Sequence, residues 1–359
     1  MKYIVCFHLF NDYSGSPKVL KMVLEGLLNK GYQVDLVSSK GGVLDELLHY
    51  KNLRKHSYGY KFSNNAAITM LRYMFVQIYT FFLAFRWLFI KDTVFYINTL
   101  LPIGPALAGR MMGKRVVYHY HENAFVKGAF YKTLAKGMQW LAHEIICVSR
   151  YQASFLKRTK GVTVVPNALS KQFTDRLLFD PDAALERKRV LMLGSLKLYK
   201  SPLEFIELAN RLSQYAFDLV VNDTQENIDG FIADHSISTP SNLTIYPRQS
   251  EVVPFYNQAS IVLNLSNRQQ VVETFSLTAL EAMSAGLPVI VPTEGGIAEM
   301  VEDGANGYRI DVQELNKIGQ QINSILSDKA LYLSLAANAF DYSQKFSEEQ
   351  MITSIDKCL

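Results

Sequence analysis

Short apolar runs alternate with segments of helical periodicity along the first half of the chain. Runs rich in β-branched residues predict strands at residues 2–7, 33–39, 93–98, 115–121, 144–149 and 162–167. Between the first two runs, residues 16–31 place apolar side chains at helical spacing and end on Gly31, which can close a helix. This alternation predicts an α/β fold, with a parallel sheet covered by helices.

The pattern pauses in a charged stretch after Asn167 and then starts again. Further strands are predicted at residues 189–195, 217–223, 242–247, 260–266 and 288–294. We therefore expect two doubly wound domains, residues 1–167 and 168–344. Sheets of this kind bind ligands outside the carboxyl ends of their strands, so two of them predict a cleft between the domains.

Charge is distributed unevenly between the two halves. Residues 1–170 contain 22 Lys and Arg against 8 Asp and Glu, whereas residues 171–359 contain 15 against 25. This asymmetry predicts domains with different roles, the basic one facing an anionic surface or ligand. No nucleic-acid-binding motif accompanies the basic half, so we expect no nucleic-acid partner.

The cysteines and the first residues bear on the compartment. Cys6, Cys147 and Cys358 are too few and too scattered for a disulfide framework or a zinc cluster. The opening MKYIVCFHLF has no cleavage-site pattern and is predicted to be a strand. Both features favour a cytoplasmic location.

Residues 66–90 form the most apolar and aromatic stretch. Arg72, Gln77 and Arg86 interrupt it, and the uninterrupted part is shorter than the ~20 residues that a membrane span needs. One interpretation is a core helix, in which Phe75, Tyr79, Phe82 and Trp87 would all point into the domain. The other is an interfacial helix that attaches the protein peripherally to the anionic inner face of a membrane. The basic first half favours the second.

Residues 273–296 (ETFSLTALEAMSAGLPVIVPTEGG) hold two glutamates eight positions apart. At about 100° per residue they would not share a helix face, so we expect Glu273 in a loop and Glu281 on a helix spanning 278–285. The amides of Phe275, Ser276 and Leu277 would then lie at a helix N-terminus, which favours a phosphate. The neighbouring carboxylates could accept hydrogen bonds from sugar hydroxyls. The alternative is an ordinary helix with two solvated glutamates.

This stretch resembles the donor-binding signature of retaining glycosyltransferases of family 4. The family has the GT-B fold, in which two Rossmann-like doubly wound domains face each other across a cleft. Residues 12–39, 148–158, 164–170, 193–209 and 304–311 resemble further segments of the family in the same order, so the resemblance covers nearly the whole chain. It implies an acceptor-binding first domain and a sugar-nucleotide-binding second domain. It also implies that a helix at about residues 345–359 packs back on the first domain.

The resemblance implies roles for individual residues. Glu281 would hold the donor ribose, and Glu273 and His121 would contact the transferred sugar. Lys200, with amides near Gly15 and Ser16, would neutralise the diphosphate leaving group. The remaining donor-binding residues would be Ser195, Phe275, Ser276 and Leu277, with Tyr246, Pro247 and Arg248 at the edge of the base pocket. A purely structural role is the alternative for His121, and more so for His119.

The chain departs from the family pattern at two points. An Arg usually follows the first strand of the second domain, where this chain has Ser195, which leaves Lys200 and Lys197 to supply positive charge. The usual Pro-Asn-Gly turn reads Pro166-Asn167-Ala168. Asp180 and Asp182 have the spacing of a metal-binding pair, but they lie away from any strand end, and we expect a solvated turn there.

The expected function is that of a retaining, metal-independent glycosyltransferase. It would move a sugar from a UDP- or GDP-sugar to a lipid-linked or polysaccharide glycan acceptor, with no cofactor besides the donor. The alternatives are a sugar-nucleotide epimerase of the same fold and a non-catalytic sugar-nucleotide-binding protein.

Overall fold

The computed structural model describes residues 3–63, 65–125 and 128–359. The chain divides into two compact units, and each has its own sheet. The first unit contains residues 1–167 and 348–359, and the second contains residues 168–347. Residues 345–347, which were expected in the returning helix, thus belong to the second unit.

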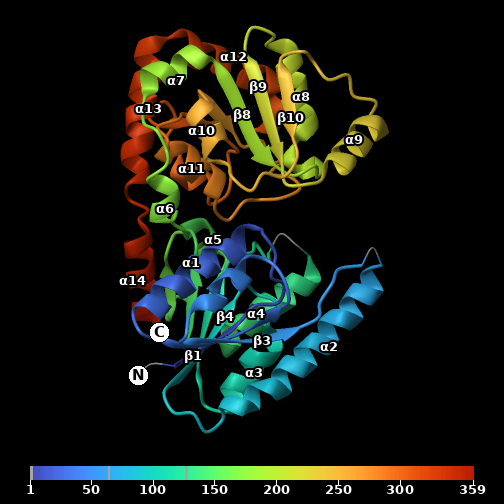
Figure 1. Ribbon diagram of the computed structural model, residues 1–359, viewed down its shortest axis with the longest axis vertical. Coiled ribbons are helices and arrows are strands. Elements are labelled where there is room, and N and C mark those ends of the chain that lie inside the picture. The colour runs from blue at the N-terminus through green and yellow to red at the C-terminus, as the bar shows by residue number, and fades with distance from the viewer. Residues whose placement is uncertain (1–2, 64, 126–127) are drawn as a thin grey trace. The chain divides into compact units, whose positions relative to one another are not determined.

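The first unit is built on a seven-stranded parallel sheet in the order β3-β2-β1-β4-β5-β6-β7 (Figure 1). The order reverses between β1 and β4, as in a doubly wound sheet. The strands are β1 (Tyr3–Phe7), β2 (Gln33–Ser39), β3 (Leu53–Tyr58), β4 (Thr93–Asn98), β5 (Arg115–Tyr120), β6 (Glu144–Cys147) and β7 (Val162–Val164). The helices are α1 (Gly15–Asn29), η1 (Val43–His49), α2 (Ala66–Ala84), η2 (Phe85–Trp87), α3 (Ile103–Met111), α4 (Ala129–Leu141), α5 (Arg150–Ser154) and α14 (Glu348–Cys358).

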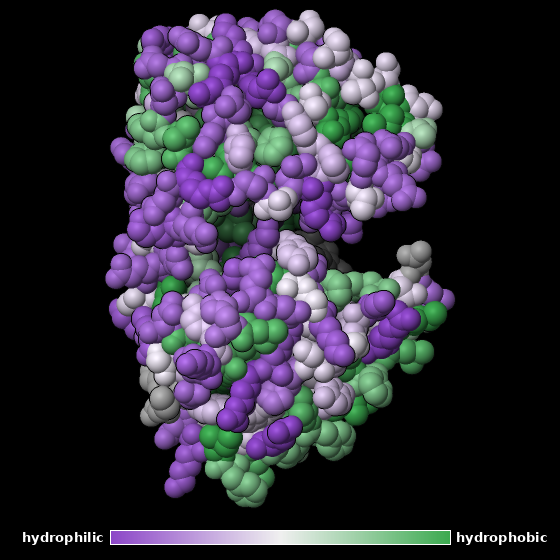
Figure 2. All heavy atoms as spheres, in the orientation of Figure 1, coloured by the Kyte–Doolittle hydropathy of each residue, from purple (hydrophilic) through white to green (hydrophobic). Residues whose placement is uncertain are grey.

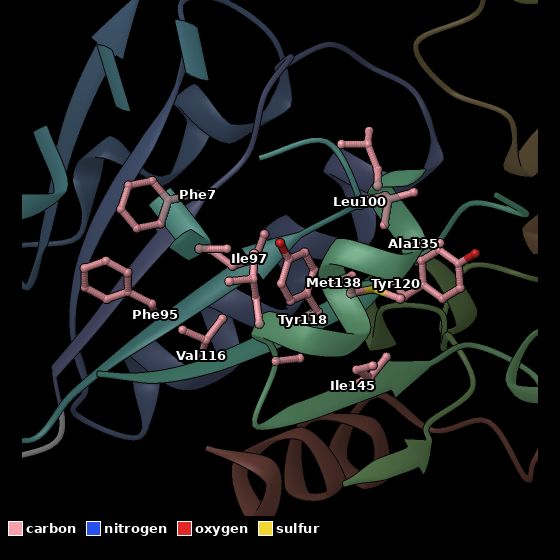
Figure 3. Packing of buried hydrophobic residues seen from close by; sticks show 14 of the residues in the cluster. Phe7, Phe95, Ile97, Leu100, Val116, Tyr118, Tyr120, Ala135, Met138 and Ile145 are labelled. Carbon is pink, nitrogen blue, oxygen red and sulfur yellow. The ribbon is translucent and has the colours of Figure 1, made fainter. Parts of the chain in front are cut away.

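The core of the first unit forms where α3 and α4 cover the central strands. Phe95 of β4, Val116 and Tyr118 of β5 and Met138 of α4 are all fully buried in this core, and Met138 lies beside Tyr118 (Figure 3). Gly109 of α3 allows close approach, because a Cβ there would lie 2.7 Å from the Phe95 ring. Burial of each such side chain contributes about 1.5–3 kcal/mol to the free energy of folding. The packed core holds the strands in place, and with them the polar residues at the strand ends.

The last helix of the chain completes the first unit. Helix α14 packs on α1, where a Cβ on Gly26 would lie 2.2 Å from the Ile352 side chain. Lys30 forms a 3.0 Å ion pair with Asp356, and Arg115 donates a 2.9 Å hydrogen bond to the Cys358 carbonyl oxygen. These contacts join the end of the chain to its first helix and to β5.

The second unit is a six-stranded parallel sheet in the order β10-β9-β8-β11-β12-β13. Its strands are β8 (Arg189–Gly194), β9 (Ala216–Val221), β10 (Leu243–Tyr246), β11 (Ile261–Leu263), β12 (Val289–Val291) and β13 (Gly307–Arg309). Its helices are α6 (Lys171–Thr174), α7 (Pro181–Arg187), η3 (Leu198–Lys200), α8 (Pro202–Arg211), α9 (Gln225–Asp234), α10 (Val253–Gln258), α11 (Leu277–Ser284), η4 (Ala298–Met300), η5 (Val312–Glu314), α12 (Leu315–Ser327) and α13 (Lys329–Ser343).

Three expectations about secondary structure need correction. The sequence pattern missed β3, because LRKHSY is half polar and forms an edge strand with only Leu53 buried. The charged stretch after Asn167 contains two short helices, α6 and α7. Several strands end two or three residues earlier than predicted: β6 ends at Cys147, β11 at Leu263 and β12 at Val291.

Helix α2 tests the core-helix interpretation of residues 66–90. Phe75, Phe82 and Tyr79 are 72%, 67% and 41% exposed, while Trp87 is 2% exposed. The core-helix interpretation is therefore wrong for three of its four side chains. Helix α2 and the turn η2 together run over 22 residues, Ala66–Trp87, and include an 18-residue window of mean hydropathy 1.4. By length and composition alone this helix could cross a membrane, although Arg72, Gln77 and Arg86 interrupt its apolar run as the sequence shows.

Candidate functional site

In the second unit, the candidate residues lie at the carboxyl edge of the sheet, where the strand order reverses between β8 and β11. Ser195 directly follows β8, and Asn264 and Ser266 follow β11. Ligands of open α/β sheets bind at such a point, because the two flanking loops diverge there. The candidate residues of this unit come from these loops, from helix α11 and from the end of β10.

Lys200 and Glu273 form an ion pair at this edge, and Glu273 is mostly buried. Ser266 Oγ donates a 2.8 Å hydrogen bond to the same carboxylate oxygen, and Lys200 Nζ donates to Ser266 Oγ over 3.3 Å. The Lys200 loop is also tied to this cluster by a 2.8 Å bond from the Asn267 amide to the Tyr199 carbonyl. A lysine and a glutamate 73 residues apart thus share one closed polar cluster.

Glu273 is held in its ionised form. Burial acts to raise the pKa of this carboxyl, but the Lys200 charge and hydrogen bonds from Lys200, Ser266 and Asn264 outweigh it. The pKa of Glu273 consequently lies below its ordinary value. The carboxylate is an acceptor for hydroxyl groups at neutral pH.

Helix α11 begins directly after this loop, as the spacing of the two glutamates predicts. Ser276 caps it by accepting a 3.2 Å hydrogen bond from the Ala279 amide, with buried Phe275 before the cap and Leu277 as the first helical residue. Gly295 holds the loop close: its φ is +110°, and a Cβ there would lie 2.5 Å from the Glu273 carbonyl oxygen. The predicted helix N-terminus is therefore confirmed and lies next to Glu273 in sequence.

Glu281 lies on α11 and accepts a hydrogen bond from the Tyr256 hydroxyl of α10. Burial and the Glu281 charge raise the pKa of Tyr256 well above its ordinary value, so this tyrosine stays a donor. The bond fixes one oxygen of the Glu281 carboxylate. Glu281 and Glu273 accordingly have different partners, on the helix and in the loop as expected.

Tyr246, Pro247 and Arg248 extend the same edge beyond β10. Arg248 Nε donates a 2.7 Å hydrogen bond to Asn222 Oδ1, and the Arg248 amide donates to the Asp223 carbonyl over 2.8 Å. The Tyr246 ring packs edge-on against the Phe255 ring, with 4.9 Å between the ring centroids. Arg248 is thus held by the loop after β9, and Tyr246 by α10.

In the first unit, His121 lies one residue beyond β5 and joins a hydrogen-bonded chain at the point where the strand order reverses. His8 Nε2 donates to the Phe10 carbonyl over 2.8 Å, which leaves His8 Nδ1 to accept from Asn98 Nδ2 at 3.1 Å. Asn98 Oδ1 then accepts from His121 Nε2, also at 3.1 Å. This chain assigns the Nε2–H form to His121.

The histidines of this cluster are neutral. Burial, with added repulsion from His119 and His8, lowers the pKa of His121 well below its ordinary value. Burial also lowers the pKa of His8 to about 4 and that of His119 to about 3. The His119 ring lies 4.1 Å from the His121 ring, and His119 Nδ1 shares a 2.7 Å hydrogen bond with the Tyr96 hydroxyl.

Gly15 and Ser16 form the first turn of α1, which Ser14 precedes as the N-cap. Asp12 accepts hydrogen bonds from the Ser14 amide at 3.0 Å and the Ser14 hydroxyl at 2.6 Å. Gly15 is exposed and Ser16 partly exposed. Their amides are at a helix N-terminus, as the sequence predicts.

The structure adds several residues that the sequence analysis missed. Neither a motif nor a distinctive spacing marks these residues, and they became visible only through their contacts with predicted residues. They are Asn264 and Ser266 beside Glu273, Tyr256 beside Glu281, and His8 and Asn98 beside His121.

Within the described ranges, no group of three or more His, Cys, Asp or Glu side chains is placed to hold a metal ion. Asp180 caps α7 by accepting a 3.1 Å bond from the Ala183 amide, and Asp182 pairs with Lys329 at 2.6 Å. Both carboxylates therefore have local roles in or beside α7.

Comparisons with known proteins extend over the whole chain. The family model for Glycosyltransferase Family 4 matches residues 13–173, and that for Glycosyl transferases group 1 matches residues 174–342. The D-inositol 3-phosphate glycosyltransferase of Corynebacterium kroppenstedtii is 26% identical over 196 residues, which are 54% of this chain and 36% of that protein. The lipopolysaccharide 1,2-N-acetylglucosaminetransferase of Salmonella typhimurium is 36% identical over 113 residues, 29% of each chain. The matches thus span about a third of the length of these curated relatives.

Solved structures match over a longer part of the chain. Alr3699/HepE of Anabaena, solved with UDP and glucose, is similar with a TM-score of 0.78 and 16% identity, covering 99% of this chain and 98% of that one. Sucrose-phosphate synthase of Thermosynechococcus elongatus has a TM-score of 0.78 and 17% identity, with coverage of 99% and 98%. These likenesses establish the two-domain, Rossmann-like GT-B fold. With two adjoining family models across residues 13–342, the chain belongs to glycosyltransferase family 4.

Proposed function

We propose that the protein is a glycosyltransferase that moves a sugar from a nucleoside diphosphate sugar to an acceptor hydroxyl. The observation that carries this proposal is the Lys200–Ser266–Glu273 cluster, which lies where the second sheet reverses its strand order and just before the N-terminus of α11. It combines a cation, an ionised acceptor and a set of helix N-terminal amides. A diphosphate joined to a hydroxyl-rich sugar needs these three features.

The structure supports a distinct task for each residue of the cluster. The Lys200 ammonium has three donors, of which Ser266 and Glu273 take two, so a third can meet a phosphate oxygen. Glu273, ionised and fixed, accepts hydroxyls of the transferred sugar. Glu281, oriented by Tyr256, accepts hydroxyls of the ribose. Ser195, Phe275, Ser276 and Leu277 line the diphosphate, and Tyr246, Pro247 and Arg248 edge the base.

In the first unit, the proposal assigns His121 to the transferred sugar and the amides of Gly15 and Ser16 to the phosphates. A neutral His121 suits this task, because it can exchange hydrogen bonds with hydroxyls without adding charge near a forming cation. The basic surplus of residues 1–170 suits an anionic acceptor.

We further propose that transfer proceeds with retention and without a metal. Departure of the diphosphate leaves negative charge on its oxygens, which Lys200 and the α11 amides stabilise. The leaving phosphate oxygen takes the acceptor proton on the same face of the sugar, and the acceptor oxygen forms the new bond to the anomeric carbon. Transfer should therefore persist in excess chelator.

The acceptor class that we propose is a lipid-linked or polysaccharide glycan, at the cytoplasmic face of an anionic membrane. One relative acts on lipopolysaccharide by name. The exposed apolar side of α2 also supports this location.

The test begins with calorimetric titration of UDP and GDP and of their sugars. The base that binds then defines the donor for a transfer assay with glycan and lipid-linked acceptors, in which the anomeric configuration of the product is determined by NMR. We expect nucleoside diphosphate to be released only when acceptor is present. Interconversion of the donor sugar without acceptor would favour an epimerase, and tight donor binding with no turnover would favour a non-catalytic protein.

A matched pair of variants separates the site from general charge effects. Glu273→Gln should abolish most transfer, whereas Lys171→Ala removes the exposed Lys171–Asp175 ion pair of the same unit and should not. Equal activity of the two variants would reject the site.

A further inference from the structure

Helix α2 and the following turn η2 bury polar side chains and expose apolar ones. Gln77 and Thr80 are buried: Gln77 Oε1 accepts a 2.9 Å hydrogen bond from the Gly104 amide of α3, and Thr80 Oγ1 donates to the Val76 carbonyl of its own helix over 2.7 Å. A Cβ on Gly104 would lie 2.2 Å from the Gln77 carbonyl oxygen, so the two helices approach closely. This arrangement is the reverse of an ordinary surface helix.

The outward side is a continuous apolar stripe. Its members follow one another at intervals of four and three residues; the first four share one face of α2, and the last two continue the stripe in η2 and the turn after it. They are Leu71, Phe75, Ile78, Phe82, Phe85 and Phe89, which we call the outer stripe. Leu71 is 71% exposed and Phe89 is 90% exposed. Figure 2 shows apolar residues along the edge of the first unit where α2 lies in Figure 1.

The charges around the outer stripe are nearly all positive. Arg72 and Arg86 are exposed beside the stripe, and exposed Lys61 and Lys91 lie before and after the helix. Asp92 is the only acidic residue in the sequence between positions 61 and 92. Apolar side chains flanked by cations match the surface of a bilayer that contains anionic lipids.

We propose that the outer stripe docks in the surface of an anionic lipid bilayer, with α2 lying in the plane of the interface. The stripe buries its aromatic side chains among the acyl chains, while the flanking Arg and Lys side chains meet the headgroup phosphates. The opposite side of α2 stays on α3, because a crossing helix would have to withdraw the Gln77–Gly104 bond. The link to a lipid-linked acceptor rests on the proposed function, but the surface itself stands on geometry and charge.

A second copy of this chain is the competing occupant, since a spacing of four and three residues also suits a helix pair. A helix pair needs only this narrow seam. Here Met70, Met74 and Tyr79 are also exposed beside it, each at 40% or more, and widen the apolar side to roughly half of the helix circumference. A broad apolar side favours lipid over a two-helix seam.

Vesicle co-sedimentation of the full chain tests the proposal. The probes are phosphatidylcholine vesicles with and without phosphatidylglycerol, at low and high salt. The variant Phe75→Ser/Phe82→Ser removes two exposed rings, and Leu48→Ser/Leu178→Ser removes two exposed leucines outside the stripe as the control. Thermal unfolding and light scattering on each protein report folding and oligomeric state.

We expect binding to phosphatidylglycerol vesicles that weakens with salt. The Phe75→Ser/Phe82→Ser variant should bind at least about tenfold more weakly at unchanged thermal stability, and the control should bind normally. Absence of binding at low salt, or equal loss in the control, would overturn the proposal. The proposal would also be overturned if the parent protein formed a dimer, did not bind vesicles, and became monomeric only in the Phe75→Ser/Phe82→Ser variant.

Nucleotide calorimetry on the same samples keeps the two proposals apart. If the parent protein binds UDP or GDP but does not bind the vesicles, the docking surface alone is rejected. If the parent protein binds the vesicles but binds no nucleotide, the proposed function alone is rejected.

Discussion

The carboxyl edge of the first sheet holds three neutral imidazole rings, those of His8, His119 and His121. They form hydrogen bonds with Asn98 and Tyr96. At the corresponding edge of the second sheet Lys200 and Glu273 form an ion pair. Both clusters occupy the point where the strand order reverses, so the same topology supports two kinds of electrostatics. The first depends on burial and hydrogen bonds, and the second on paired charges.

The difference determines how each edge can be disrupted. An ion pair is vulnerable to removal of one partner, since the remaining charge is left in a partly buried site. A neutral histidine cluster is vulnerable to acid, because protonation would place positive charges beside each other in a buried site. Four expected results follow, from the largest effect to the smallest.

Lys200→Ala should have the largest effect, on turnover. Charge grows on the departing diphosphate only as the glycosidic bond breaks, so we expect kcat to fall about 10²- to 10³-fold, with a smaller loss in donor binding. Steady-state kinetics and donor calorimetry measure the two losses separately. Equal losses would make Lys200 a simple binding residue, and no loss would remove it from the site.

Acid should weaken the first unit in a defined pH window. The folded pKa of His8, at about 4, lies below the unfolded value of about 6.5, so its contribution is complete above pH 6.5 and is lost as the pH falls toward 4. The expected slope is about 1.4 kcal/mol per pH unit for each such histidine, and about 3 kcal/mol in total for His8.

Urea unfolding followed by tryptophan fluorescence measures this loss, since both tryptophans, Trp87 and Trp140, belong to the first unit. His8→Gln should flatten the pH dependence. A stability that is constant from pH 6.5 to 4 would show that the cluster is not held neutral.

Glu281→Gln should weaken donor binding while preserving the shape of the side chain. A hydrogen bond to a charged group contributes about 1.5–3 kcal/mol, so the donor Kd should rise about 10- to 100-fold. Tyr256→Phe, which removes only the orienting hydroxyl, should cause a smaller loss. Unchanged nucleotide affinity in calorimetry of Glu281→Gln would exclude a ribose contact.

Asp175→Asn should have the smallest effect. Asp175 pairs with Lys171 across an exposed turn of α6, and such pairs stabilise proteins by less than about 0.5 kcal/mol. We expect the same urea midpoint and the same turnover as in the parent protein. A large loss of turnover or stability in Asp175→Asn would mean that loss of any ion pair, buried or exposed, is enough to explain the effect expected for Lys200→Ala.

The comparison of the two edges also shows what a sequence can reveal. Strand β4, with the apolar run at residues 94–97, was predicted at the bounds it has in the structure, because burial on both faces of a parallel sheet requires that composition. Strand β3 was not predicted, because an edge strand can keep half of its side chains polar. The helix after Glu273 was predicted because Gly286 and the helix-forming residues before it are local signals.

Partnerships across long sequence separations were not predictable. Lys200 and Glu273 were both expected near a diphosphate or its sugar, but nothing local indicated that they would pair. Asn98 and Tyr256 belong to a strand and a helix with no motif, and their importance comes from the residues that they orient. Whether each site residue contacts a donor stays a prediction for the experiments above.

The return of α14 to α1 has a consequence for biosynthesis. The chain leaves the first unit after Asn167 and re-enters it at Glu348, so the whole second unit is synthesised in between. Until Ile352 and Asp356 emerge from the ribosome, the surface of α1 around Gly26 and Lys30 has no covering helix. The second unit can therefore finish folding first, even though it is the later one in sequence. A single proteolytic cut at either crossing would leave the two units covalently joined through the other.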